Sequence, residues 1–554
     1  MARTVSIGVQ DFEEIISKDC FYVDKTDFIR EWWESADKVT LITRPRRFGK
    51  TLNMNMLERF FSVKFKGQGE VFEGLNIWKE EKYREIQGAY PVIFLSFAGV
   101  KANNYEDTRE QIFQVIEDLY IKHIFLKDSG VLEVKEKEYF DRVGQDMSDS
   151  DAVMSLHRLS DYLCRYYGKK TIILLDEYDT PLQEAYTAGY WREVAALTRN
   201  LFNNTFKTNP YLERAVMTGI TRVSKESLFS DLNNLRVITT TSDEYAPYFG
   251  FTEEEVFAAM DEFDMTNKDE VKQWYDGFTI GNHKDIYNPW SIIYFLKEKK
   301  LKPYWANTSS NSLAGSLIRK GNKNIKMQFE DLLQQRSIHS VIDEEIVFNQ
   351  LDESDESAVW SLLFASGYLK VLEIQGDVYE LELTNYEVRK TFERMVSGWF
   401  SKNSADYNDF IKALLRADVE EMNEYMEQVA ESMFSSFDGG EKPSARTPER
   451  FYHGFVLGLL VDLRGRYEVL SNRESGFGRY DVMLKPLNGT DDAIIMEFKV
   501  YNPKKEKSLE ETVQNALQQI ADKKYEQTLL EQGIGKERIR KYGFAFRGKE
   551  VLIG

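Results

Sequence analysis

The sequence predicts an α/β protein made of several domains. At 554 residues the chain is too long for one hydrophobic core, and about three domains are expected at roughly 100–200 residues each. Strand patterns alternate with helical patterns in the first part, which favours a parallel sheet covered by helices on both faces. The middle part is mostly helical in pattern, and a second strand-and-helix pattern closes the sequence.

The first α/β domain is expected over residues 1–245. It begins with an apolar strand at 38–43, a turn-like TRPRRFG segment and an amphipathic helix from Lys50 to Phe61. Further strands are expected at 91–97, 170–179 and 213–224, with helices at 105–126, 153–167 and 190–206 between them. Short strands separated by longer helices are typical of parallel sheets.

The rest of the chain divides into a helical region and a second α/β domain. Residues 246–435 form a mostly helical lid or middle region, for which a winged helix is one option. Residues 436–448 contain Gly, Pro and Ser and read as a linker. The domain at 449–554 is expected to contain helices at 449–463 and 508–528, strands near 467–471, 479–485 and 492–500, and a last strand.

Composition excludes several classes of protein. Hydrophobic residues make up 42% of the chain and aromatic residues 14%, which is incompatible with an intrinsically disordered protein. Two cysteines, Cys20 and Cys164, cannot build a disulfide framework or a four-thiolate zinc site. The apolar runs are far shorter than the roughly 20 residues that span a bilayer. We therefore expect a soluble cytoplasmic protein with no membrane partner.

The charge differs between the two ends of the chain. The net charge of −19 argues against a protein that coats DNA in general. Residues 441–554, in contrast, hold 20 Lys and Arg against 17 Asp and Glu. The charge difference alone is also compatible with ordinary variation between domains. The acidic N-terminal portion fits a protein partner or a second copy of the chain better than it fits DNA.

The loop R-P-R-R-F-G-K-T at 44–51 lies between an expected strand and an expected helix. A phosphate-binding loop needs inward-facing backbone N–H groups, a helix N-terminus, a lysine for the phosphates and a hydroxyl for Mg²⁺. Gly49, Lys50 and Thr51 supply the end of this pattern, whereas Arg44 stands where the pattern has its first glycine. On its own, the Gly-Lys-Thr triplet is a weak signal.

A second signal follows the strand Ile172–Leu175. It ends in Asp176 and Glu177, and in nucleotide hydrolases the first such acid holds Mg²⁺ while the second orients the attacking water. Thr221 and Arg222 follow the next strand and are candidates for sensing the γ-phosphate. For Asp176 and Glu177, the alternative is a polar strand end that caps the next helix. For Arg222, the alternative is a structural ion pair.

The stretches IGVQDFEEI, FYVDKTDFI, LITRPRRFGKT, IILLDEYDTPLQEAY and MTGITRVSKESLFSDLNNL, with YNPWS at 287–291, carry a resemblance. The chain resembles the bacterial AAA-ATPase-like family, which is usually paired with a C-terminal PD-(D/E)XK nuclease-like domain. Arg in place of the first glycine is the form this family shows. The resemblance implies an additional-strand, AAA-like P-loop NTPase fold and an ATP and Mg²⁺ site. Its nucleotide-binding residues would be Arg46, Arg47, Phe48, Gly49, Lys50, Thr51, Asp176, Thr221 and Arg222.

In additional-strand ATPases, a segment before the phosphate loop contacts the adenine. Tyr22–Thr26 is placed for that role. The alternative is an ordinary helix start with Asp24 or Thr26 as its N-cap, and the sequence leaves both open.

The C-terminal region holds a separate set of polar residues. Asp481 precedes a strand-like segment, and Glu497 and Lys499 follow the apolar AIIM. Alternation along a strand places Glu497 and Lys499 on one face, and a neighbouring strand can bring Asp481 to them. Two carboxylates suit Mg²⁺ or Mn²⁺, while the lysine positions hydroxide or offsets developing charge. The order of elements, helix-strand-hairpin-strand-helix, is that of the PD-(D/E)XK, restriction-endonuclease-like fold.

Further residues around this set are candidates for supporting roles. Glu449 or His453 could add a ligand from the first helix, Gln518 could touch phosphate or metal, and Glu474 is a hydrogen-bonding loop residue. The alternative for the three helical positions is a solvated helix face. A phosphodiester backbone or plain solvent could face Lys504, Lys505, Lys507, Lys523 and Lys524.

Taken together, these patterns favour an ATP-binding and hydrolysing protein coupled to a metal-dependent nuclease domain that acts on nucleic acid. Glu177, Asp481, Glu497 and Lys499 would be catalytic, and Thr51, Asp176, Asp481 and Glu497 would hold metal. The alternative is an ATP-dependent switch whose C-terminal domain binds nucleic acid or protein without cutting. A third option is a nuclease whose phosphate loop is only structural.

Overall fold

A computed structural model describes most of the chain in two compact units. The first unit is Met1–Lys320 with Ser337–Val388, and the second is Gly321–Arg336 with Arg389–Gly554. The described residues are 3–221, 229, 232–305, 312–343, 351, 355–400, 407–434, 456, 460, 463, 466–471, 474–475, 478–479, 481–547 and 550–554.

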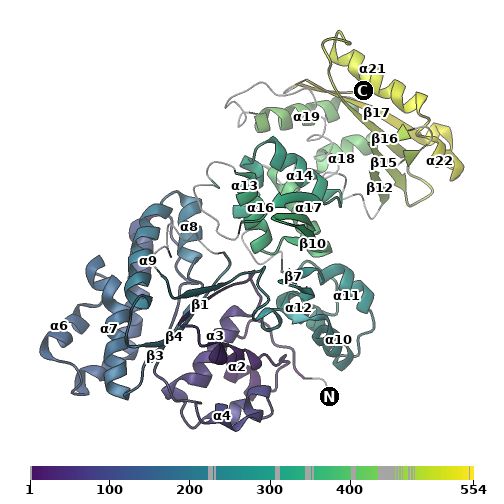
Figure 1. The fold of residues 1–554 in the computed structure, drawn as a ribbon. Helices are drawn as coiled ribbons and strands as arrows, with labels where there is room; N and C mark the ends of the chain where they lie inside the picture. Colours follow the sequence, from purple (N-terminus) through teal and green to yellow (C-terminus); the bar gives the residue numbers. More distant parts are fainter. Residues whose placement is uncertain are drawn as a thin grey trace. The chain divides into compact units, whose positions relative to one another are not determined.

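A five-stranded parallel sheet forms the centre of the first unit (Figure 1). Its spatial order is β2-β3-β4-β1-β5, and each neighbouring pair is parallel. The strands are β1 (Val39–Thr43), β2 (Val92–Ser96), β3 (Thr171–Asp176), β4 (Leu212–Gly219) and β5 (Leu235–Ile238). Full burial of β1 and β3 fits strands covered on both faces. The parallel sheet that the sequence predicts is therefore confirmed, with β5 as an additional edge strand.

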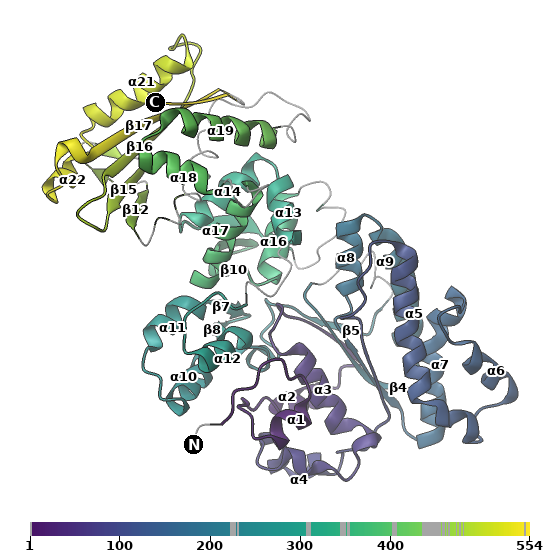
Figure 2. The ribbon, with the colours of Figure 1, turned by 180° about the vertical axis from the view of Figure 1, so that it is seen from behind.

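Amphipathic helices pack around this sheet. Helices α5, α7 and α9 contact one another as one layer, while α3, which follows the loop after β1, lies with α1, α2 and α4 across the sheet (Figures 1 and 2). Local sequence fixes where helices begin: the Asn104 and Ser148 side chains accept hydrogen bonds at the starts of α5 and α7. The bounds are α1 (Phe12–Ser17), α2 (Asp27–Ser35), α3 (Lys50–Phe61), α4 (Glu81–Arg84), α5 (Tyr105–Lys122), α6 (Val134–Arg142), α7 (Asp149–Tyr167), α8 (Thr180–Ala188) and α9 (Trp191–Phe206).

The first unit continues into a smaller helical part with two small sheets. The sheet β6-β8-β7 is antiparallel, and so is the sheet β10-β11-β9. A capping box begins α10, in which Thr252 and Glu255 each accept a backbone N–H. The elements are β6 (Phe251–Thr252), α10 (Glu253–Glu262), α11 (Lys268–Tyr275), β7 (Phe278–Ile280), β8 (His283–Tyr287), α12 (Pro289–Glu298), α13 (Ser312–Lys320), β9 (Ile338–Val341), α16 (Glu356–Ala365), β10 (Leu369–Gln375) and β11 (Val378–Leu383).

A mixed five-stranded sheet forms the second unit, in the order β12-β15-β16-β17-β18. Only β16 and β17 pair in parallel among its neighbouring strands. Buried side chains such as Phe498 and Phe544 pack with residues of the preceding helices in one core. The elements are α14 (Lys323–Leu333), α18 (Tyr407–Arg416), α19 (Val419–Phe434), β12 (Tyr467–Ser471), β13 (Glu474–Ser475), β14 (Gly478–Arg479), β15 (Val482–Pro486), β16 (Ala493–Val500), α21 (Leu509–Asp522), α22 (Gln527–Glu531), β17 (Ile539–Arg547) and β18 (Glu550–Ile553), while α17 (Tyr386–Phe400) begins in the first unit and continues into the second from Arg389.

The expected C-terminal α/β domain is confirmed by this mixed sheet. The single helix expected at 508–528 is divided into α21 and α22. Within the part of the chain that the structure describes, no helix is both long and apolar enough to span a bilayer.

Candidate functional site

The loop between β1 and α3 has the backbone shape of an anion-binding nest. Arg47 has φ of 67° and Gly49 has φ of 81°, both in the left-handed region. Alternating handedness over successive residues turns neighbouring N–H groups toward one concavity, which is how nests bind phosphate. Gly49 also precedes the first residue of α3, whose N-terminus favours negative charge.

Lys50 is buried at the first position of α3, with 4% of its surface exposed. Its Nζ donates to the carbonyl oxygens of Arg44 and Pro45, each at 3.0 Å. Burial lowers the pKa of Lys50, although Glu177, Asp179 and Asp176 act in the opposite direction. The ammonium is thus held inside the loop and faces a group of carboxylates.

Thr51 and Asp176 form a pair of oxygen donors beside the lysine. The Thr51 hydroxyl donates to Asp176 Oδ2 at 2.8 Å, and the Thr218 hydroxyl donates to Asp176 Oδ1 at 2.6 Å. Burial raises the pKa of Asp176, an effect that the two hydroxyl groups oppose. A hydroxyl and a carboxylate are hard oxygen ligands, so this pair fits Mg²⁺.

Glu177 follows directly but points differently from Asp176. Its backbone is left-handed, with φ of 51°, and its amide donates to Thr218 Oγ1 at 3.3 Å. Glu177 Oε2 accepts from the Thr180 hydroxyl at 3.1 Å, and the side chain is partly exposed. The two adjacent acids therefore differ, one being buried among hydroxyl groups and the other half-open to solvent.

Asp179 is a buried acid that our reading of the sequence missed. Its Oδ2 accepts from the amides of Ile220 and Thr221, at 2.9 and 3.0 Å, and from Gln183 Nε2 at 2.7 Å. Tyr178 donates its hydroxyl to the carbonyl oxygen of Thr221 at 2.6 Å. The Thr221 backbone is thus fixed beside Asp179, while its role at the γ-phosphate stays a prediction and Arg222 lies outside the described residues.

Two signals in the sequence could have identified Asp179. It repeats the acid of Asp176 at a spacing of three, directly after the strand. Gly219 is the second signal, because a Cβ there would lie 2.8 Å from Asp179 Oδ1 and 2.6 Å from the Tyr178 ring. A glycine opposite the acidic motif therefore indicates close packing between the two strand ends.

Arg44, at the position of the missing glycine, is fully buried and points away from the nest. Its guanidinium donates to the carbonyl oxygens of Thr43, Thr239 and Glu244. Burial lowers the pKa of Arg44 to about 9. Arg44 thus ties the loop to the segment after β5, which is a structural role.

The other loop side chains are held by surrounding elements. Arg46 Nη2 donates to Gln183 Oε1 at 3.3 Å, and the Arg47 guanidinium lies 4.1 Å from the Trp290 ring centroid. Phe48 is fully buried and packs edge-on against Phe278, with ring centroids 4.9 Å apart. The three residues lie in the loop as predicted, and their nucleotide contacts remain a prediction.

The segment Tyr22–Thr26 is tied down by structural contacts. The Asp24 carboxylate accepts from the Thr26 amide and hydroxyl at the start of α2 and from the Asn76 amide. Lys25 is 6% exposed and donates to Glu255 and to the Pro247 carbonyl, each at 2.6 Å. These contacts favour the helix-start interpretation of this segment over adenine recognition.

The second set of predicted residues comes together on the sheet of the second unit. The Phe498 amide, on β16, donates to Asp481 Oδ2 at 2.8 Å, which places Asp481 beside that strand. Glu497 is 3% exposed and Lys499 is partly exposed. Both interact with Gln519 of α21: Lys499 Nζ donates to its Oε1 at 2.6 Å, and its Nε2 donates to Glu497. Glu497 and Lys499 therefore share one face of β16.

Gln519, rather than the expected Gln518, is the glutamine of this site. Gln518 is exposed and donates to Asp522 at 2.7 Å, one turn along the same helix. Gln519 Nε2 also donates to the Tyr525 hydroxyl at 3.2 Å. Burial raises the pKa of Tyr525, and Glu497 and Asp481 add to the effect, so both carboxylates lie near the phenol. The two glutamines are neighbours in α21 and therefore point to different sides of the helix. Sequence patterns do not place helix residues to within one position.

The remaining candidates divide into two groups. The side chains of Glu449, His453 and Glu474 lie outside the described residues. Exposure is the feature shared by Lys504, Lys505, Lys507, Lys523 and Lys524. An exposed lysine suits both a phosphodiester backbone and plain solvent, so their role stays a prediction.

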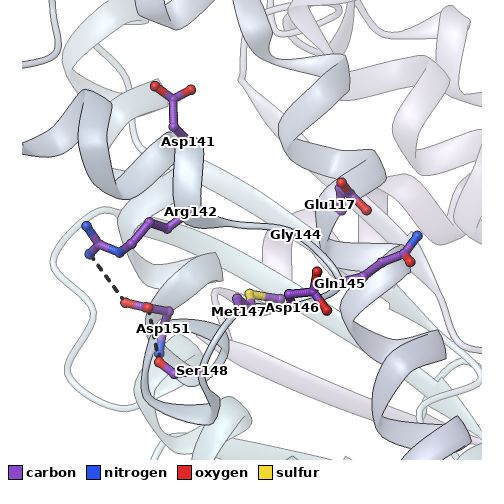
Figure 3. A pocket seen from close by; sticks show the side chains of 9 residues that line it. All are labelled: Glu117, Asp141, Arg142, Gly144, Gln145, Asp146, Met147, Ser148 and Asp151. Atoms are coloured by element: carbon purple, nitrogen blue, oxygen red, sulfur yellow. Dashed lines mark hydrogen bonds and ion pairs between the residues drawn. The ribbon is translucent and has the colours of Figure 1, made fainter.

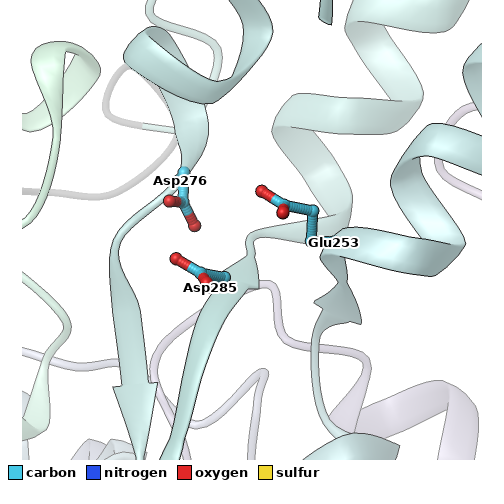
Figure 4. Close-up of side chains that lie close together, drawn as sticks. All are labelled: Glu253, Asp276 and Asp285. Carbon is cyan, nitrogen blue, oxygen red and sulfur yellow. The ribbon is translucent and has the colours of Figure 1, made fainter. Parts of the chain in front are cut away.

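A cluster of three acids also lies in the helical part of the first unit (Figure 4). One oxygen from each of Glu253, Asp276 and Asp285 lies within 4.8 Å of the others. Lys272 Nζ is 2.5 Å from Glu253, 3.8 Å from Asp285 and 4.0 Å from Asp276. The ammonium already serves as their counter-ion, so the cluster is not assigned to a metal.

An open polar hollow lies between α5, α6 and α7 (Figure 3). Glu117 comes from α5, Asp141 and Arg142 from the end of α6, and Asp151 from α7. Arg142 lies 3.6 Å from Asp151 as an exposed ion pair. None of the predicted site residues lines this hollow.

Comparison with known proteins identifies two domains. Residues 6–229 match the family described as predicted AAA-ATPase, and residues 447–554 match the PD-(D/E)XK nuclease superfamily. The chain thus carries an AAA-ATPase-like domain followed by a nuclease-superfamily domain, which confirms the resemblance given by the motifs.

Individual relatives add little about function. An uncharacterized protein in the vnfD 5′ region of Azotobacter chroococcum mcd 1 is 27% identical over 394 residues, covering 70% of this chain and 68% of that protein. A solved structure from Pyrococcus horikoshii, a signal transduction ATPase with numerous domains and a tetratricopeptide repeat sensor, is 12% identical with a TM-score of 0.23. The match covers 79% of this chain and about half, 53%, of that one.

Proposed function

We propose that the first unit binds and hydrolyses ATP, and that the second unit cuts nucleic-acid phosphodiester bonds with the help of Mg²⁺ or Mn²⁺. The observation that carries the ATP half is the Thr51–Asp176 hydrogen bond at 2.8 Å beside Lys50 and the nest. A hydroxyl, a buried carboxylate and an ammonium around one anion-binding loop are the parts that nucleotide hydrolysis requires.

Each residue of the loop has a distinct part in this proposal. The N–H groups of the nest and Lys50 bind the phosphates, while Thr51 and Asp176 hold Mg²⁺. When bound, Mg²⁺ offsets the charge of the phosphate oxygens. Glu177, which is partly exposed, would orient the attacking water, and Thr221, whose amide donates to Asp179, would contact the γ-phosphate. Arg222 remains a candidate for the same phosphate.

In the second unit, Asp481 and Glu497 are proposed as metal ligands. The fit is supported by the Phe498 amide of β16, which donates to Asp481 Oδ2 at 2.8 Å and so places this carboxylate beside the strand that carries Glu497. A bound divalent cation would polarise the phosphodiester and lower the pKa of a water molecule. Lys499 then lies on the same strand face to position that water or to offset charge, with Gln519 holding its ammonium in place. Nucleic acid is accordingly the expected partner of this unit.

A nucleotide-binding and hydrolysis assay tests the first half. Lys50→Ala should lose ATP turnover and most of its affinity, whereas the control Lys135→Ala, at an exposed site of α6, should behave as wild type. Turnover by Lys50→Ala at the wild-type rate would refute the ATPase proposal.

A cleavage assay tests the second half. Plasmid, linear duplex, single-stranded DNA and RNA are incubated with Mg²⁺ or Mn²⁺, with and without ATP. We expect cleavage by the wild type and by Glu510→Ala, an exposed helix position, and none by Glu497→Ala. Intact substrates throughout, together with nucleic-acid binding, would instead favour an ATP-dependent switch that binds without cutting.

A further inference from the structure

Two side chains from outside the loop between β1 and α3 hold one of its carbonyl groups. The Arg46 carbonyl oxygen accepts a hydrogen bond from Asn288 Nδ2 at 3.2 Å and another from Trp305 Nε1 at 3.1 Å. Both donors lie in the helical part of the first unit, more than 240 residues further along the chain. Two donors satisfy both lone pairs of this oxygen, so its direction is fixed.

The Arg46 carbonyl belongs to the peptide bond that joins Arg46 to Arg47, a residue with a strained backbone. Arg47 adopts φ of 67°, which costs energy for any residue with a Cβ and persists only where the surroundings enforce it. The Arg47 guanidinium lies over the Trp290 ring, 4.1 Å from its centroid. The segment around the start of α12 therefore contacts Arg47 and the peptide before it.

The two donors are themselves fixed by a buried acid and a helix cap. Asn288 Oδ1 accepts from the amides of Trp290 and Ser291, at 2.9 and 3.3 Å, and so caps α12. Glu387 is fully buried and accepts from the Trp305 amide at 2.6 Å and from the Ser291 hydroxyl at 2.7 Å. The Glu387 carboxylate therefore links Trp305 to Ser291, whose amide donates to Asn288, and so connects the two donors.

We propose that Asn288 and Trp305 are positioning residues for the phosphates of the nucleotide, an inference that rests on the proposed ATP binding. A trans peptide is planar, so its carbonyl and its N–H point in opposite directions. Holding the Arg46 oxygen outward turns the Arg47 N–H into the nest. In many phosphate loops glycines allow this geometry; here, with Arg44 at the first position and Arg47 left-handed, remote side chains enforce it.

Two conservative substitutions separate positioning from packing. Asn288→Asp keeps an oxygen to cap α12 but replaces the amide donor with an acceptor. Trp305→Phe keeps an aromatic ring against Phe278 and Tyr368, with centroids at 5.7 and 5.4 Å in the wild type, and removes the N–H together with part of the indole ring.

The chain provides matched controls for both changes. Asn104 caps α5 through its Oδ1 and donates its Nδ2 to Asp107 at 2.8 Å, so Asn104→Asp also keeps the capping oxygen and loses an amide donor, away from the loop. Trp32 is fully buried and its Nε1 donates no hydrogen bond, so Trp32→Phe shrinks a core tryptophan without removing a donor.

The experiment measures binding of a fluorescent ATP analogue with Mg²⁺ to the full chain, and thermal unfolding without nucleotide. We expect Asn288→Asp and Trp305→Phe each to raise the Kd by about 5- to 30-fold, the effect of losing one oriented hydrogen bond. Their Tm without nucleotide should match that of the corresponding control, whose Kd should be unchanged. The double variant should lose less than the product of the two effects, because both donors hold one oxygen.

Three outcomes decide the proposal. Wild-type affinity in both variants would overturn it, and so would a lowered Tm with unchanged Kd, which indicates packing alone. A wild-type chain that binds no nucleotide would refute the proposed function itself and the positioning role with it.

Discussion

The two sites of this protein are built in different ways. In the first unit, the loop between β1 and α3 is one short segment, yet its Arg46 carbonyl accepts hydrogen bonds from Asn288 and Trp305, far along the chain. In the second unit, Asp481, Glu497 and Lys499 lie on or beside one strand, and a single side chain, Gln519, joins two of them. In both sites, the candidate residues themselves lie close together. Their supporting contacts come from residues far along the chain in the first unit, and from Gln519 of the neighbouring helix α21 in the second.

This difference determines how each site should fail. Removing one distant donor should lower affinity only in part, whereas removing Gln519 takes away a contact of both Glu497 and Lys499 at once. We expect the largest effects from substitutions that remove a proposed catalytic group and leave the supporting hydrogen bonds intact.

Glu177→Gln should give the largest effect. The amide cannot accept a proton from water, so ATP turnover should fall by about 10²- to 10⁴-fold while ATP binding is kept, because the phosphate contacts lie elsewhere. Steady-state hydrolysis and a nucleotide titration measure both quantities. Glu184→Gln, on α8, is the control, and turnover unchanged in Glu177→Gln would remove Glu177 from the mechanism.

Gln519→Ala should follow, and it tests the contact that Glu497 and Lys499 share. Without the amide that joins Glu497 and Lys499, cleavage should fall by roughly 10- to 100-fold, as is usual for residues that orient metal ligands. The neighbouring Gln518→Ala, on the exposed face of the same helix, should leave the rate unchanged. Equal rates in the two variants would mean that Glu497 and Lys499 hold their positions without this amide.

Asp179→Ala should act on stability more than on chemistry. It leaves the buried amides of Ile220 and Thr221 without an acceptor, at a cost of about 2–4 kcal/mol in the free energy of unfolding. Urea unfolding of the full chain measures this cost, with exposed Asp146→Ala as control. A cost below about 0.5 kcal/mol would show that water or a shift of the loop replaces the carboxylate.

The sequence could predict what depends on neighbouring residues. The parallel sheet follows from strand and helix periodicity, and the Glu497–Lys499 face follows from alternation along one strand. It could not predict β5, because the four residues LRVI of this edge strand are too few to show a period, nor the choice of Gln519 over Gln518. The bonds from Asn288 and Trp305 to Arg46 were also out of reach, because contacts between distant residues leave no periodic signal in one sequence.

The smallest expected effect concerns the acidic cluster of Figure 4, Glu253, Asp276 and Asp285, to which no catalytic or positioning role is assigned. Burial and the neighbouring Asp285 raise the pKa of Asp276 to about 7, with Lys272 acting in the opposite direction. A carboxyl group whose pKa is higher in the folded state stabilises the fold at low pH, and this contribution is lost as pH rises from about 4 through 7. Asp276→Asn cannot titrate, so the wild type should lose about 1–2 kcal/mol relative to the variant between pH 5 and pH 8. Urea unfolding of both proteins at the two pH values measures this difference, in which the other titrating groups largely cancel. A difference that stays constant with pH would mean that Lys272 keeps Asp276 ionised throughout, and the cluster would then be a simple ion-pair network.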